Sequence, residues 1–276
     1  TITMTNNFIK YELTHDVLAD MTDDQHPTIL RGMVNDRWEL EDNGTHMGYI
    51  LEGTAILIDY KTDINIELQA GMYFQLPNDG SVNINGRGIV ITRLNYNGLF
   101  KVGGPIEDKG RMKYIDGCTD TLLLDPVLLG DPCLNGLYFI PNILQTQHTH
   151  PSMRVGIVVQ GRGECIVPKT GVMTEEDSKY MQGIDAKDRD QTEKFNELFD
   201  RIELKVGTTF VIPTDSWHSF RTFADKEGKE TTMTVIAYHP DSDFGPTHED
   251  HPMINRTWVD GVSANEIKDI QTKELT

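Results

Sequence analysis

The feature that most constrains the fold is a series of short apolar runs rich in Val, Ile, Tyr and Phe. Each run stops at Gly, Pro, Asn or Asp, as in "GYILEGTAILIDY", "RVGIVVQGRGECIVP", "GTTFVIPTD" and "TMTVIAYHP". Short β-branched and aromatic runs separated by turn-forming residues are typical of sandwiches and barrels. We therefore expect an all-β fold.

One acidic stretch departs from this pattern. In "DAKDRDQTEKFNELFDRIEL", residues 185–204, the apolar side chains of Phe195, Leu198, Phe199 and Ile202 recur at spacings of three and four. This period is that of an amphipathic helix. We expect a helix here, within an insertion at about 169–203.

The chain repeats itself weakly. Residues 46–58, "HMGYILEGTAILI", align with residues 154–167, "RVGIVVQGRGECIV", at an offset of 108. Residues 71–79, "GMYFQLPND", align with residues 207–215, "GTTFVIPTD", at an offset of 136. Two copies of one β unit, the second enlarged by the insertion, explain both offsets. We expect one domain over residues 1–110 and a second over residues 111–276.

Composition excludes several classes of partner. With 43 acidic and 25 basic residues the net charge is −18, which argues against binding to nucleic acid or to an anionic membrane. The three cysteines form no CxxC pair, which favours a reducing compartment. No apolar run is long enough for a transmembrane helix, and the first residues lack a signal-peptide core. We expect a cytoplasmic protein.

Three histidines form the candidate metal site. His148 and His150 are separated by one residue, so in a strand both imidazoles point to the same face and can chelate a metal from one side. His218 follows a glycine, a strand and a proline turn, which would return the chain to this pair. We expect His148, His150 and His218 to be metal ligands.

Arg154 belongs to the same face by strand alternation. A guanidinium cannot ligate a metal, and it is costly to bury without a partner. A carboxylate that binds it through two hydrogen bonds would relieve this cost. The partner is either an anionic substrate, which gives Arg154 a substrate-binding and catalytic role, or a protein acid such as Asp215 or Glu164.

Two segments resemble the motifs of the cupin family. Residues 148–161, "HTHPSMRVGIVVQG", resemble the first cupin motif, with Arg154 where a glutamate usually stands. Residues 207–222, "GTTFVIPTDSWHSFRT", resemble the second, with Asp215 in place of glycine and Thr222 in place of asparagine. The resemblance implies two double-stranded β-helix (jelly-roll) barrels, with the helical insertion in the second.

The first repeat lacks the ligands of this motif. At the same offsets, the positions of the three histidines are occupied by Leu40, Asp42 and Val82. The chain therefore resembles a two-barrel cupin, a bicupin, with one divalent metal held in the C-terminal barrel.

Cupins with three histidines and no glutamate include thiol dioxygenases and the gentisate- and salicylate-type ring-cleaving dioxygenases. In the ring-cleaving enzymes, however, the arginine lies further along the strand and the metal usually occupies the first barrel. The resemblance implies a non-heme iron dioxygenase that acts on a small carboxylate-bearing substrate, aromatic ones included. Iron(II) is the preferred ion, with manganese, nickel and zinc open. The alternatives are a non-oxidative isomerase, lyase or hydrolase, and a small-molecule-binding protein without catalysis.

Further residues are candidates for the substrate pocket. Phe220 and Thr222 share the face of His218 by alternation, Gln145 precedes the histidine pair, and Tyr238 ends a predicted strand. Core or rim positions are the alternative for each. The segment 242–261, with His248 and His251, is a loop, a lid or a second metal site. Sheet pairing between copies would give a homodimer or a higher homo-oligomer.

Overall fold

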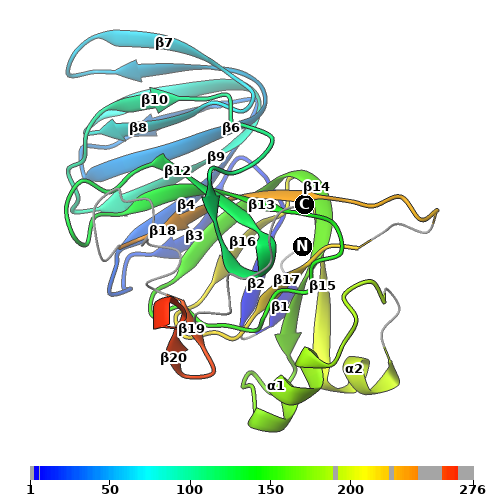
Figure 1. The fold of residues 1–276 in the computed structure, drawn as a ribbon. Coiled ribbons are helices and arrows are strands. Elements are labelled where there is room, and N and C mark those ends of the chain that lie inside the picture. Colours follow the sequence, from blue (N-terminus) through cyan, green and yellow to red (C-terminus); the bar gives the residue numbers. More distant parts are fainter. Residues whose placement is uncertain (1–2, 6, 189–191, 224–226, 242–256, 267–276) are drawn as a thin grey trace.

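The protein consists mainly of two large antiparallel sheets, shown in Figure 1. The computed structural model describes residues 3–5, 7–188, 192–223, 227–241 and 257–266. The prediction of an all-β fold with a short helical insertion is confirmed. No helix in the described part of the chain is long and apolar enough to cross a membrane.

The first sheet comes from the N-terminal half, drawn in blue to cyan in Figure 1. Its strand order is β10-β8-β6-β9-β4-β3, with β7 paired to β6 and β5 paired to β9. The strands are β3 (Val17–Met21), β4 (Thr28–Val34), β5 (Arg37–Leu40), β6 (Gly44–Asp59), β7 (Ile64–Gln69), β8 (Tyr73–Pro77), β9 (Gly80–Leu94) and β10 (Lys101–Gly103).

The second sheet has the order β1-β2-β16-β14-β18-β13-β12-β11, with β15 and β17 paired to β14. The strands are β1 (Thr3–Thr5), β2 (Phe8–Tyr11), β11 (Met112–Lys113), β12 (Thr119–Leu124), β13 (Cys133–Phe139), β14 (Arg154–Pro168), β15 (Phe199–Lys205), β16 (Thr209–Ile212), β17 (Ser219–Arg221) and β18 (Met233–His239). A small hairpin, β19 (Trp258–Val259) and β20 (Val262–Ser263), forms a sheet of its own, and its Trp258 pairs with Thr149 before β14.

The two N-terminal strands do not belong to the first sheet. β2 pairs with β16, and Phe8 is fully buried with its ring 5.0 Å from that of Phe210. A domain running from residue 1 to residue 110 is therefore wrong for these strands. Sequence offsets align repeats, but they carry no information about which sheet edge a terminal strand joins.

One long strand in each half pairs with different neighbours along its length. The first part of β6 pairs with β8 and its second part with β7, and β14 divides in the same way between β16 and β15. The chain turns at Gly53 and Gly161, whose φ angles are 77° and 69°. A Cβ at either position would lie within 2 Å of a carbonyl oxygen on the neighbouring strand. These matched glycines explain why the repeat is visible in the sequence.

The insertion holds two short helices, α1 (Glu175–Gln182) and α2 (Glu193–Leu198). The predicted helix over 185–204 is confirmed only for Glu193–Leu198. Residues 185–188 form no helix, and residues from Phe199 form β15 and pair with β14. In β15, Phe199, Ile202 and Leu204 are buried. A spacing of three suits a helix in isolation, but pairing with a long neighbouring strand decides the conformation here.

The core divides into separate clusters. One lies within the first sheet around Ile50 and Leu76, and another within the second around Phe139 and Phe210. A third cluster joins the halves, since it contains Leu30 and Met47 together with Val155, Ile236 and Tyr238. The second-sheet cluster surrounds the candidate site.

Candidate metal centre

The three predicted ligands converge in the second sheet. The segment before β14 runs antiparallel to the segment that leads into β17, and a β-bridge joins His148 to His218. The N–H of His148 donates to the carbonyl of His218 at 3.0 Å, and the reverse bond is 3.1 Å. This backbone pairing brings the second motif beside the first, and alternation adds His150 on the same face.

The three imidazoles are close and enclosed. One nitrogen from each ring lies within 4.8 Å of the others, and each residue is at most 3% exposed. Among the described residues, no other group of three or more His, Cys, Asp or Glu side chains meets this condition. Three facing imidazole nitrogens suit Zn, Cu, Fe or Ni.

Hydrogen bonds fix the ring nitrogens. The Nδ1–H of His148 donates to the carbonyl of Thr146 at 2.7 Å, and that of His218 donates to the carbonyl of Ser216 at 2.8 Å. A carbonyl only accepts, so Nδ1 carries the proton and Nε2 keeps its lone pair. The Nδ1 of His150 lies 3.2 Å from the hydroxyl of Thr257. Such partners orient the rings of metal-binding histidines.

Burial keeps these rings neutral. It lowers the pKa of His148 to about 4, and it places the pKa values of His150 and His218 well below their ordinary value. The positive charge of Arg154 acts in the same direction on all three. Neutral imidazole is the form that binds a metal.

Arg154 lies beside the triad. It is 2% exposed and lines the same cavity as the three histidines. Its Nη1 donates to the hydroxyl of Ser152 at 2.8 Å and to the carbonyl of Met153 at 3.0 Å. Neither protein acid proposed from the sequence is its partner: Glu164 binds Arg201 and Arg221, and Asp215 is exposed.

The cavity around the triad is small and largely apolar. Its volume is about 20 Å³, which is room for about one water molecule. Besides the triad and Arg154, its lining consists of Tyr114, Leu137, Phe210, Ile212, Phe220, Val235 and Ala237. These side chains shield the histidines from bulk water.

Comparison with known proteins gives matches among solved structures alone. No protein-family model and no curated protein matches the chain. A solved structure of a putative glyoxylate-induced protein from Pseudomonas aeruginosa superposes with a TM-score of 0.50 at 11% identity, over 89% of this chain and 86% of that one. A cupin 2 conserved barrel domain protein from Leptotrichia buccalis gives 0.47 at 11% identity, over 86% and 90%. The chain shares an all-β fold with the glyoxylate-induced protein.

A further similar solved structure is the oxalate decarboxylase of Bacillus subtilis, a protein described with Mn(II) centres. It superposes with a TM-score of 0.48 at 9% identity, over 90% of this chain and 80% of that one.

Of the four further pocket residues predicted from the sequence, Phe220 lines the cavity around the triad. Its ring lies 5.9 Å from that of His218. The other three candidates are not among the described residues that line this cavity. The hydroxyl of Thr222 donates to the carbonyl of Ile140, and Tyr238 lies on the opposite face of its strand, where it contacts Thr28. Gln145 lines a different cavity.

Several residues that line the cavity around the triad were not predicted from the sequence. Phe210 and Ile212 alternate along β16, and Val235 and Ala237 alternate along β18, so a period of two could have indicated them. Tyr114 precedes a short 3-10 turn and gives no local signal. Its place beside the triad depends on contacts distant in sequence.

In the N-terminal half, strand pairing corrects the sequence alignment at one of the three ligand positions. Leu40 pairs with Gly80, as His148 pairs with His218, so Gly80 rather than Val82 occupies the position of the third histidine. The turn after Pro77 is two residues shorter than the turn after Pro213. Leu40 is buried in the apolar core and Asp42 is exposed. The second histidine cluster, His248 and His251, lies outside the described residues.

Proposed function

We propose that this protein is a metal-dependent enzyme in which His148, His150 and His218 hold one divalent ion in the C-terminal of two cupin barrels. The observation that carries the proposal is the convergence of three buried, neutral imidazoles. On two of them Nδ1 is bound to a backbone carbonyl, which leaves Nε2 as the ligand atom. Three protein ligands leave coordination positions for small molecules, as catalytic sites require.

The ion would supply Lewis acidity and, if it is iron(II), redox chemistry with dioxygen. The residues around it have separate tasks. Arg154 offers a fixed positive charge within the cavity, where it would bind a substrate carboxylate and orient it. Phe210, Phe220 and Val235 exclude water, which strengthens the electrostatic interactions inside.

Among reactions, we favour a dioxygenase acting on a small carboxylate-bearing substrate, distantly similar to the gentisate- and salicylate-type enzymes. A cavity of about 20 Å³ supports a compact substrate group over an aromatic ring. A non-oxidative isomerase, lyase or hydrolase would use the same ligands with zinc, nickel or manganese. A binding protein without catalysis would hold the same ion and bind its ligand without turnover.

Metal analysis of protein purified without air separates these functions. We expect about one iron per chain by elemental analysis, and oxygen consumption when short-chain carboxylates are added. One zinc, nickel or manganese per chain, with no oxygen uptake, would support non-oxidative chemistry. Absence of any metal after growth in a balanced metal mixture would contradict the proposal.

A further inference from the structure

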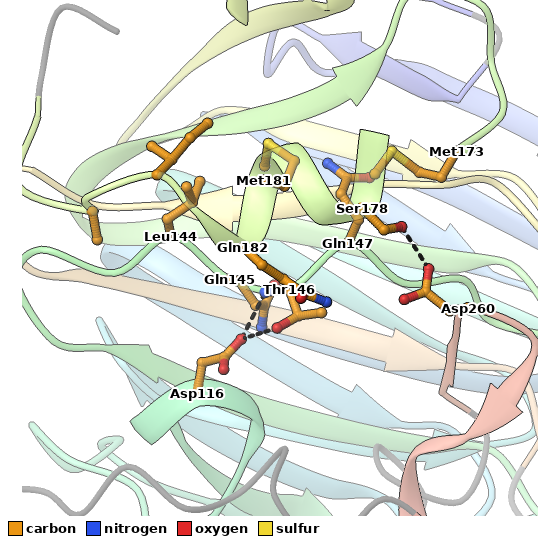
Figure 2. A pocket seen from close by; sticks show the side chains of 12 residues that line it. Asp116, Leu144, Gln145, Thr146, Gln147, Met173, Ser178, Met181, Gln182 and Asp260 are labelled. Carbon is orange, nitrogen blue, oxygen red and sulfur yellow. Dashed lines mark hydrogen bonds between the residues drawn. The ribbon is translucent and has the colours of Figure 1, made fainter. Parts of the chain in front are cut away.

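A second cavity lies beside residues 144–147, which directly precede His148 and His150 in the chain. Its volume is about 220 Å³, and it shares no lining residue with the metal cavity. Figure 2 shows it between residues 144–147, the insertion helix α1 and Asp260. The insertion therefore builds one wall of this partly open cavity, a role that the metal site does not account for.

Two buried glutamines line this cavity with fixed amide orientations. Gln145 Oε1 accepts from the backbone N–H of Phe220 at 3.2 Å, and Gln147 Nε2 donates to the carbonyl of Ile166 at 2.9 Å. Each bond determines which amide atom is oxygen and which is nitrogen. Within the described residues, the remaining atoms, Gln145 Nε2 and Gln147 Oε1, have no hydrogen-bond partner, although the side chains are 1% and 3% exposed.

A buried donor or acceptor without a partner is costly. Here one donor and one acceptor belong to side chains two residues apart in the segment before β14. A ligand that satisfies both must present an acceptor next to a donor.

The rest of the lining restricts the charge of the ligand. Asp116 accepts two hydrogen bonds from Thr146, and Asp260 accepts one from Ser178, as the dashed lines in Figure 2 show. No Lys, Arg or His is among the described residues that line the cavity. An anion would face these carboxylates without a countercharge. Leu144, Met173, Met181 and Ile184 supply apolar wall.

We propose that this cavity binds a small uncharged molecule with a primary carboxamide and a short apolar chain. The ligand carbonyl accepts from Gln145 Nε2, its N–H donates to Gln147 Oε1, and its chain contacts the two methionines. The corresponding carboxylate lacks the donor and is repelled by the acids. The corresponding ammonium is attracted by the acids but has no acceptor for Gln145 Nε2.

The test uses the metal-loaded full chain labelled with ¹³C at the methionine methyl groups. Butyramide, butyrate and butylammonium are titrated, and the signals of Met173 and Met181 are followed after assignment by Met→Leu substitution. We expect saturable shifts of both signals with butyramide in the millimolar range, and at least tenfold weaker binding of the other two. No saturable shift, or equal or tighter binding of butyrate or butylammonium, would overturn the proposal.

Substitutions test the contacts. Gln145→Glu keeps an oxygen for the N–H of Phe220 but replaces the donor, so butyramide affinity should fall at least tenfold. Ser178→Phe, which fills the cavity without altering either glutamine, should have a similar effect. Gln69→Glu, an exposed position on β7, makes the same change in charge and should bind like the parent protein. Unchanged affinity in both cavity variants contradicts the site. Metal content, measured in parallel, separates this proposal from the proposed function.

Discussion

At the scale of residues, the arrangement around each histidine is decided by what its second nitrogen contacts. Backbone carbonyls two residues earlier hold Nδ1 of His148 and of His218. Each ring is therefore oriented by its own segment, and the β-bridge between the segments brings the free nitrogens together. Because the groups that orient these two rings lie within two residues of them, a short sequence motif is sufficient to indicate the site.

Removal of a ligand should release the metal and leave the fold. His148→Ala and His218→Ala should each reduce bound metal from about one per chain to a small fraction, because two imidazoles bind far more weakly than three. Elemental analysis measures the metal, and circular dichroism the fold. His46→Ala is the control, since His46 is a buried histidine of the first sheet that binds Thr92. Full metal retention in both ligand variants would disprove the assignment.

The metal-free protein should lose stability in mild acid. Its His148 has a pKa of about 4 when folded, against the ordinary 6.5. Between these values the unfolded chain binds a proton that the folded chain does not, so the free energy of unfolding falls as the pH drops through this window. The loss for His148 alone is about 3 kcal/mol, and it ends below its folded pKa. Urea unfolding should show a shallower pH dependence for His148→Gln; an identical dependence would contradict the pKa.

Arg154 should be needed for the binding of anions but not for the binding of the metal. Arg154→Met keeps an unbranched side chain but removes the charge, so we expect unchanged metal content and about tenfold weaker formate binding, a loss of about 1.4 kcal/mol. Formate affinity is measured by calorimetry on metal-loaded protein. Ser152→Ala, which keeps the charge of Arg154 but removes the hydroxyl that accepts from Nη1 and donates to Asp241, is the matched control. Loss of the fold in Arg154→Met would identify a structural arginine.

At the scale of elements, the N-terminal strands complete the metal-binding half. β2 covers the edge of β16, and Phe8 packs on Phe210, which lines the metal cavity. The beginning of the chain thus supports a site located far along the sequence. An edge strand left uncovered would expose unpaired backbone groups.

Phe8→Ala should lower the free energy of unfolding by about 3–5 kcal/mol, as expected for a fully buried phenylalanine. It should also weaken metal retention, because Phe210 loses its stacking partner. Chemical denaturation and metal titration with a competing chelator measure the two effects. Val17→Ala, at a strand position that is 42% exposed, should change neither. A stable Phe8→Ala variant would show that β2 is dispensable.

At the scale of the whole molecule, the two halves share a core. Leu30 and Met47 from the first sheet pack in one cluster with Val155 and Ile236 from the second. The hydroxyls of Tyr238 and Thr28 lie 3.0 Å apart across the same boundary. Neither half buries this surface alone.

We therefore expect one cooperative unfolding transition for the whole chain. Tryptophan fluorescence and far-ultraviolet circular dichroism should give coincident urea midpoints, since Trp38 reports on the first half and Trp217 on the second. Tyr238→Phe should lower the midpoint by an amount equivalent to about 1 kcal/mol without splitting the transition. Two separate transitions would contradict the shared core.

Much of the site could be predicted from sequence because its determinants are local. The i, i+2 spacing of His148 and His150 fixes a common face, and the same alternation correctly carries Arg154 into the cavity. Gly53 and Gly161 mark equivalent turns because only glycine fits there. All of these inferences need only the geometry of a single strand.

Tertiary structure alone decided which parts of the molecule each strand face contacts. Alternation could not tell that Tyr238 faces the other half, that the hydroxyl of Thr222 is bound by the backbone, or that Gln145 lines a second cavity. A two-residue difference in turn length placed Gly80, not Val82, opposite Leu40. Local sequence therefore determined which side chains could act together, whereas long-range strand pairing decided which of them do, because register and partner choice depend on residues far apart in the chain.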